Sequence, residues 1–131
     1  MLYHSNEYSE RYNEFCRVFW FAHRRSKHLQ VWSFDSIDDL KPYLEKIVDL
    51  DVKTLLEKRT TMFDGVQLYV DSGAAKIKSG FKEGNIFLPL TSTHEAFPKI
   101  VKNPGSDTFY IPHSKEELAL YLERFPDSVP L

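Results

Sequence analysis

The chain has 131 residues, a length typical of one domain with its own hydrophobic core, and 42% of them are hydrophobic. Its 17 basic and 19 acidic residues give a formal net charge of -2, which argues against the strongly basic surface of a nonspecific nucleic-acid-binding protein. No apolar stretch approaches the roughly 20 residues of a membrane span, and the charged N-terminus has no secretory signal. We therefore expect residues 1–131 to form a single globular domain of a soluble, cytoplasmic protein.

The N-terminal third predicts one helix and one strand. Residues 5–27 carry apolar side chains at helical spacing with polar residues opposite, which favours an amphipathic helix. A hairpin that turns at Arg25-Ser26 is the alternative interpretation. Residues 29–34 have the length and composition of a strand, and we expect this strand to be the first.

The following segment predicts helices that begin at acidic or hydroxyl caps. Asp35 or Ser36 can cap a helix with an apolar stripe from Leu40 to Val48, although Pro42 requires a kink or a later start. Asp51 can cap a second stripe that continues to residue 59. The two helices could also be one bent helix.

The second half predicts most of the strands. Residues 66–70, entered through Asp64-Gly65, form the clearest strand, and residues 75–78 and 86–90 could pair as a hairpin. A short helix could begin at residues 91–93, and residues 103–105 should interrupt regular secondary structure. Residues 108–111 should be the last strand. Ser114 and Glu117 fit a capping box for a helix that Pro126 stops.

These elements predict the fold class. With strands mostly in the second half and helices before and after them, we expect a single-domain α+β fold. Its sheet should be largely antiparallel, with four or five strands, packed by about four helices. The sequence does not specify the strand order.

A short acidic motif suggests one catalytic hypothesis. If residues 47–54 formed a strand, Asp49, Asp51 and Lys53 would share one face. That arrangement resembles the Asp…(Asp/Glu)-x-Lys core of the restriction-endonuclease-like nucleases, and the resemblance implies that the two acids hold magnesium and that the lysine activates water. The same residues also fit the boundary between the two helices, which is the favoured interpretation.

Metal and thiol chemistry have little support. The five histidines include no pair at i, i+4, and Cys16 has no cysteine partner, so we expect no metal and no other cofactor. Cys16 falls on the apolar face of the first predicted helix, where a buried structural thiol is the common outcome.

Charge and aromatic residues are unevenly distributed. Residues 23–28 form a basic tract beside aromatic residues, which could contact nucleic acid or simply end a helix. Residues 35–51 hold six acids and two lysines. Eight of the aromatic residues lie within residues 8–34, more than one helix face can bury, and aromatic residues are enriched in protein interfaces. The residues predicted to bind a partner are Phe19, Trp20, Trp32, Asp35, Asp38 and Asp39.

These patterns favour a protein-binding protein over an enzyme. We expect an intracellular inhibitor or immunity-type protein that covers the active site of a toxin or enzyme, because an acidic surface complements the basic site of a nucleic-acid-degrading target. The alternative is a metal-dependent nuclease or nucleic-acid-binding protein that uses Asp49, Asp51 and Lys53. The oligomeric state is not specified.

Overall fold

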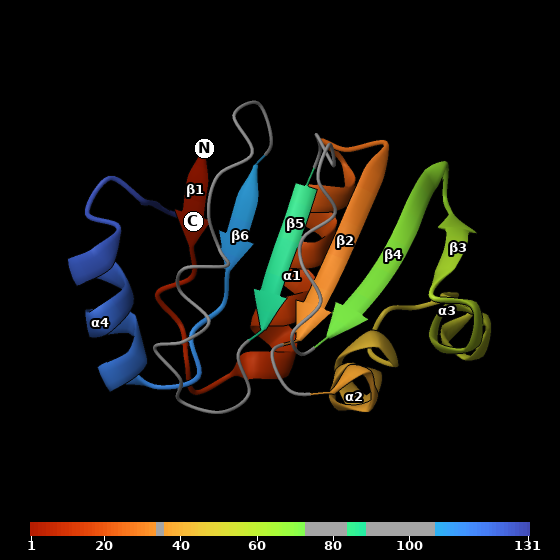
Figure 1. Ribbon diagram of the computed structural model, residues 1–131, viewed down its shortest axis with the longest axis horizontal. Helices are drawn as coiled ribbons and strands as arrows, with labels where there is room; N and C mark the ends of the chain where they lie inside the picture. The colour runs from red at the N-terminus through yellow and green to blue at the C-terminus, as the bar shows by residue number, and fades with distance from the viewer. Residues whose placement is uncertain (34–35, 73–83, 89–106) are drawn as a thin grey trace.

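A seven-stranded mixed sheet organises the chain (Figure 1). The computed structural model describes residues 1–33, 36–72, 84–88 and 107–131. The strands are β1 (Leu2–His4), β2 (His28–Ser33), β3 (Thr60–Phe63), β4 (Val66–Ser72), β5 (Gly84–Leu88), β6 (Thr108–Tyr110) and β7 (Val129–Pro130). The helices are α1 (Arg11–His23), the 3-10 helix η1 (Ile37–Leu40), α2 (Lys41–Leu44), α3 (Val52–Lys58) and α4 (Lys115–Arg124).

The sheet corrects the predicted topology. Its strand order is β3-β4-β2-β5-β6-β1-β7, and in the described ranges only the β3–β4 pair is antiparallel. The α+β class is confirmed, but the expected four- or five-stranded, largely antiparallel sheet is wrong. Instead of pairing with its neighbours along the chain, β2 lies between β4 and β5, parallel to both. Parallel pairing needs long crossover connections, and here helices make several of them.

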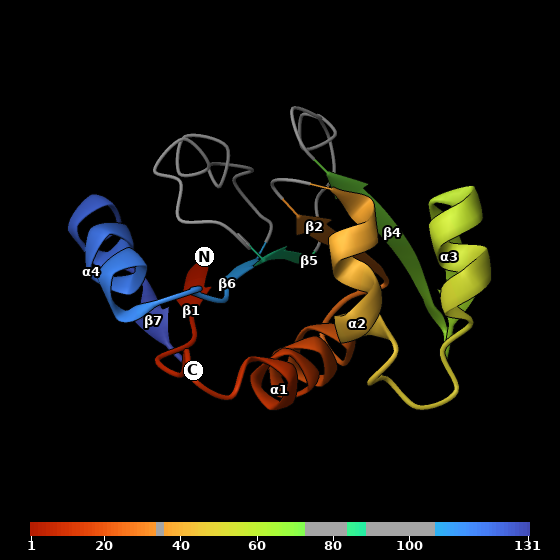
Figure 2. The ribbon, with the colours of Figure 1, turned by 90° about the horizontal axis from the view of Figure 1, so that it is seen from below.

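The two faces of the sheet bury different side chains. Alternate residues of the central strands, such as Leu29 and Val31 of β2, join the main core with the apolar residues of α1, η1, α2 and α3. The intervening residues point to the other face, where Trp32, Phe87 and Tyr110 pack against Tyr121 of α4. Seen from below, α1 and α4 accordingly lie on opposite sides of the sheet (Figure 2).

Most helix predictions are confirmed, with shorter bounds. The helix expected over residues 5–27 is α1, and its hairpin alternative is wrong. Pro42 lies in the first turn of α2, where a missing N–H costs little, so it causes no break. The helices before and after residues 45–51 are separate, because Asp49 adopts a left-handed conformation with φ of 67°.

The caps predicted at Ser36, Asp51 and Ser114 form. The hydroxyl of Ser36 accepts a hydrogen bond from the N–H of Asp38, and the Asp51 carboxylate accepts one from the N–H of Thr54. Ser114 accepts from the N–H of Glu117 at 3.2 Å. The return bond differs from a standard capping box, since Glu117 accepts from the N–H of His113, one residue before the cap.

The strand predictions are only partly confirmed. Residues 66–70 and 108–111 correspond to β4 and β6, but β1 precedes the strand expected to be first and β7 follows the one expected to be last. β5 forms within the second arm of the expected hairpin and is a central strand, parallel to both neighbours. The other arm, at residues 75–78, lies outside the described residues, as do the short helix expected near residue 91 and the break at 103–105.

Two glycines meet specific local requirements. Asp64 and Gly65, with φ of 47° and 81°, make the two-residue turn between β3 and β4, and Asp-Gly suits a turn that needs two positive φ angles. At the start of β5, a Cβ on Gly84 would lie 2.7 Å from the Ser26 hydroxyl and 2.9 Å from a methyl carbon of Leu29. Gly84 therefore allows β5 to approach β2.

Candidate protein interface

The predicted partner-binding residues do not form one site. Phe19 and Trp32 are fully buried, Phe19 in the main core and Trp32 against α4, so neither presents a surface to a partner. Trp20 is half-buried. Asp38 is exposed and Asp39 half-buried at the start of η1, and Asp35 lies outside the described residues.

A second surface was not predicted as a site. A hollow of about 470 Å³ is lined by Trp20 of α1, Val48 and Asp49 after α2, and Phe63 and Asp64 at the β3–β4 turn. We call these five residues the Trp20 hollow. Volumes of this order fall within the usual range of ligand-sized pockets.

The aromatic side of the hollow is fixed by packing on the core. The Trp20 ring lies edge-on to Phe19, with centroids 5.5 Å apart, and 5.8 Å from the ring of Phe63. His23, one turn further along α1, lies 5.4 Å from Trp20, and its Nε2 is 3.0 Å from the carbonyl oxygen of Phe63. These contacts join the end of α1 to the β3–β4 hairpin and hold both rings in place.

The acidic side of the hollow comes from two tight turns. Asp49 and Asp64 both have positive φ, a conformation that Asp tolerates better than most residues. Both are exposed, and neither carboxylate has an ion pair or hydrogen bond within the ranges that the structure describes. Val48 lies on the rim with 73% of its surface exposed. The hollow thus combines aromatic surface with two unpaired negative charges.

Four acidic residues lie in the short helical segments and the turn that lead to this hollow, and we call them the acidic surface. It consists of Asp38, Asp39, Glu45 and Asp49, whose carboxylates pair with no cation in the described part of the chain. Lys46, within the same segment, lies over the ring of Tyr12 with its Nζ 5.6 Å from the centroid. With Lys41 and Lys46 in the same segment, residues 38–49 keep a net charge of -2.

The strand needed by the nuclease hypothesis is absent. Residues 47–54 form a turn followed by the first residues of α3, so Asp49, Asp51 and Lys53 do not alternate along a strand. Hydrogen bonds from the N–H and hydroxyl of Thr54, at 3.1 and 2.7 Å, hold the Asp51 carboxylate and lower its pKa. Asp51 therefore acts as a helix cap.

The basic tract is divided between the end of α1 and the start of β2. His23 is buried against Phe63, whereas the guanidinium of Arg25 lies 4.4 Å from the ring centroid of Phe21 and 5.9 Å from that of Tyr3. These contacts direct two of its six residues toward the protein itself. The tract fits the end of a helix better than a nucleic-acid surface.

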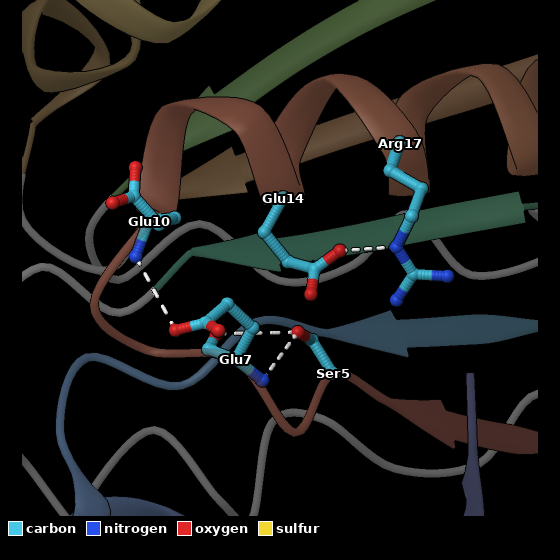
Figure 3. Close-up of polar contacts among 5 residues, drawn as sticks. All are labelled: Ser5, Glu7, Glu10, Glu14 and Arg17. Carbon is cyan, nitrogen blue, oxygen red and sulfur yellow. Dashed lines mark hydrogen bonds and ion pairs between the residues drawn. The ribbon is translucent and has the colours of Figure 1, made fainter.

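Carboxylates also gather where β1 leads into α1 (Figure 3). Glu7 accepts hydrogen bonds from the hydroxyl of Ser9 at 2.5 Å and from the N–H groups of Ser9 and Glu10 at 2.8 and 3.4 Å, which lower its pKa. It thereby holds the turn that leads into α1, whose N-cap residue Glu10 makes no capping hydrogen bond with its side chain. Glu14 forms an ion pair with Arg17. This cluster stabilises the helix.

Arg11, the first residue of α1, links this helix to two other segments of the chain. Its Nε donates to the Tyr43 hydroxyl at 2.9 Å and its Nη1 to the Pro112 carbonyl at 2.5 Å, so it joins α1 to α2 and to the residues after β6. Together with desolvation, its charge lowers the pKa of His113. No group of three or more His, Cys, Asp or Glu side chains in the described ranges could hold a metal ion.

The Trp20 hollow combines Trp20 with Asp49, which the sequence had assigned to the nuclease hypothesis, and with three residues that were not predicted to form a site. Trp20 was expected to bind a partner, but Val48, Asp49, Phe63 and Asp64 were not grouped with it. Asp64-Gly65 between apolar residues is a strong hairpin signal, and treating it as one would have placed Phe63 beside β4. The contact between this hairpin and α1 is long-range and has no local signal.

Comparisons with protein families, curated proteins and solved structures found no match to this chain. No helix in the described ranges is both long enough and apolar enough to cross a membrane.

Proposed function

We propose that the chain is a cytoplasmic protein-binding protein of the inhibitor or immunity type, which covers the basic site of a toxin or enzyme. The observation that supports this proposal is the acidic surface of Asp38, Asp39, Glu45 and Asp49. A surface with net charge of one sign attracts a partner of the opposite sign and orients it before contact.

The position of this surface on the fold favours recognition of a macromolecule. Its carboxylates lie on two consecutive short helical segments and the turn that follows, and the Tyr43 and Leu44 side chains anchor α2 in the core. The charges are thus displayed on a packed scaffold, which lowers the entropic cost of binding. Val48 and Trp20 add apolar area at one end, as interface centres require.

A capture experiment tests the proposal. The chain is immobilised and exposed to an extract of the cells that produce it, and the retained proteins are quantified for the wild type and for the double variant Asp38→Lys/Asp39→Lys. We expect a basic protein that is retained by the wild type and lost by this variant, because attraction has become repulsion. The purified partner should then lose its own activity when the chain is added.

A matched charge reversal controls for nonspecific effects. Glu123 of α4 and Asp127 are also exposed acids, on elements outside the acidic surface. The variant Glu123→Lys/Asp127→Lys changes the net charge by the same amount and should retain the partner. If both variants lose the partner equally, the effect comes from net charge alone and not from the acidic surface. If both retain the partner equally, the proposal is wrong.

A further inference from the structure

We propose that the Trp20 hollow binds one arginine side chain of the partner. This inference rests on the proposed function and specifies the residue that anchors the partner. Its basis is that two aromatic residues, Trp20 and Phe63, and two exposed acidic residues, Asp49 and Asp64, line a single hollow.

The chemistry of the lining favours a cation over a neutral group. An apolar side chain could cover the two rings but would leave both carboxylates without a partner. A cationic side chain places its methylene stem on the rings and its charge beside the carboxylates, so both halves of the lining are used. The space of about 470 Å³ accommodates one long side chain.

Arginine suits the lining better than lysine. Its guanidinium is planar and weakly hydrated, stacks on aromatic faces, and can donate to two carboxylates at once, whereas an ammonium is a compact and strongly hydrated charge. Within the chain, the shortest cation–ring distance among the described residues is that of an arginine, Arg25 over Phe21 at 4.4 Å, against 5.6 Å for Lys46 over Tyr12.

The aromatic wall of the hollow is preorganised for this ligand. Trp20 and Phe63 contact each other and His23, so the two rings are held in place before binding. The rings therefore need little rearrangement, and the hollow can serve as a central anchor while the acidic surface supplies long-range attraction.

A small-molecule titration of the chain alone tests the hollow. The probe is Nα-acetyl-arginine methylamide, and the neutral isostere Nα-acetyl-citrulline methylamide is its control. The readout is the pair of tryptophan indole N–H signals in the nitrogen-15 correlation spectrum. Trp20 borders the hollow and Trp32 is fully buried elsewhere, so the second signal is an internal reference. Trp20→Phe assigns the two signals.

We expect the arginine probe to shift the Trp20 signal saturably and to leave the Trp32 signal unchanged. The citrulline probe should bind at least about tenfold more weakly, a difference of about 1.4 kcal/mol, because it lacks the charge. Asp49→Asn/Asp64→Asn, which keeps the shape of the hollow, should weaken the arginine probe by a similar factor. Asp38→Lys/Asp39→Lys, which lies outside the hollow, should leave the Trp20 shift in place.

Three results would overturn the inference: no saturable shift of the Trp20 signal, equal binding of the citrulline probe, or tighter binding of the corresponding lysine probe. Each is independent of the capture experiment. If the arginine probe fails while Asp38→Lys/Asp39→Lys still abolishes partner capture, the inference alone is wrong. If the probe binds and capture is unaffected, the hollow binds arginine but the proposed function is wrong.

Discussion

Phe19 and Trp20 are adjacent in α1, yet their side chains have different surroundings. Phe19 is fully buried among the residues of the main core, whereas Trp20 is half-buried at the edge of the hollow. Phe19→Ala should lower the free energy of unfolding by about 3–5 kcal/mol, because it leaves a cavity in a packed core. Trp20→Ala should cost clearly less, since its ring is only partly removed from water. Urea denaturation of the two variants measures both values, and equal losses would place Trp20 in the core.

Two buried tyrosines predict a loss of stability at high pH. Burial raises the pKa of Tyr121 to about 12, against an ordinary value near 10, and burial also raises that of Tyr110. Above pH of about 10 the unfolded chain releases these protons while the folded chain keeps them. The free energy of unfolding should therefore be unaffected by these groups below about pH 10 and should fall between about pH 10 and 12.

Tyr121→Phe isolates one of these contributions. The variant loses the 2.9 Å hydrogen bond to the Ser128 hydroxyl, but Ser128 keeps its 2.8 Å contact with Nδ1 of His4. Its stability should decline less steeply above about pH 10, by at most about 1.4 kcal/mol per pH unit. Urea denaturation at several pH values gives the slope for both proteins. A wild-type slope retained in full would show that Tyr121 ionises without opposing the fold.

At the scale of the element, α4 depends on its cap. The Ser114 hydroxyl accepts the N–H of Glu117, which has no partner inside the first turn of the helix. Ser114→Ala should lower the free energy of unfolding by about 1 kcal/mol. The control substitution Lys115→Ala, at the exposed neighbouring residue, should have little effect. Denaturant unfolding compares the two variants. An unchanged midpoint for Ser114→Ala would mean that water replaces the hydroxyl without cost.

The β3–β4 turn permits a matched pair of substitutions. Gly65 has φ of 81°, and a Cβ there would meet no atom within 4 Å, so the cost of a side chain is backbone strain alone. Gly65→Ala should cost about 1 kcal/mol and Gly65→Asn less, because Asn tolerates the left-handed conformation. Equal losses in thermal unfolding would show that the strain is not specific to the backbone angle.

Local elements were more predictable than their pairing. The caps at Ser36, Asp51 and Ser114 depend on contacts within three residues, and all three form as expected. β1 and β7 have only 3 and 2 residues and exist because they pair with each other, with β1 also paired to β6. No periodicity can identify such strands, since their hydrogen-bonding partners lie far away in the sequence.

The predicted antiparallel arrangement of the strands was wrong for the same reason. Residues 75–78 and 86–90 were expected to pair as a hairpin in a largely antiparallel sheet, yet in the described ranges only β3 and β4 form an antiparallel pair. In β5 all five residues are buried, as in parallel strands covered on both faces, and the available sequence signal was the uninterrupted apolar run Ile86-Phe87-Leu88. Of the aromatic residues near the N-terminus, Phe15, Phe19 and Trp32 are buried, Trp20 and Phe21 are half-buried, and Tyr8 and Tyr12 are exposed.

At the scale of the molecule, the sheet separates two surfaces with different chemistry. The helices on the α1 side carry the acidic surface and the Trp20 hollow, whereas α4 on the other side covers an aromatic cluster. Asp49 belongs to both the acidic surface and the hollow, so one docked partner can use long-range attraction and a local anchor together. Because association rate and dissociation rate depend on different contacts, the two features can be tested separately.

The acidic surface predicts association kinetics that depend on salt. Attraction between exposed charges is screened beyond about 8 Å at physiological ionic strength, so the association rate constant of the chain with its basic partner should fall as salt rises. Asp38→Lys/Asp39→Lys should lower that rate constant by about tenfold or more at low salt and weaken its salt dependence. Thermal unfolding should change little, because Asp38 is exposed and Asp39 only half-buried.

Asp49→Asn/Asp64→Asn should act mainly on dissociation, because it weakens the anchor. Stopped-flow measurements at several salt concentrations give both rate constants. An association rate constant that changes neither with salt nor in Asp38→Lys/Asp39→Lys would show that these carboxylates do not contribute to partner association.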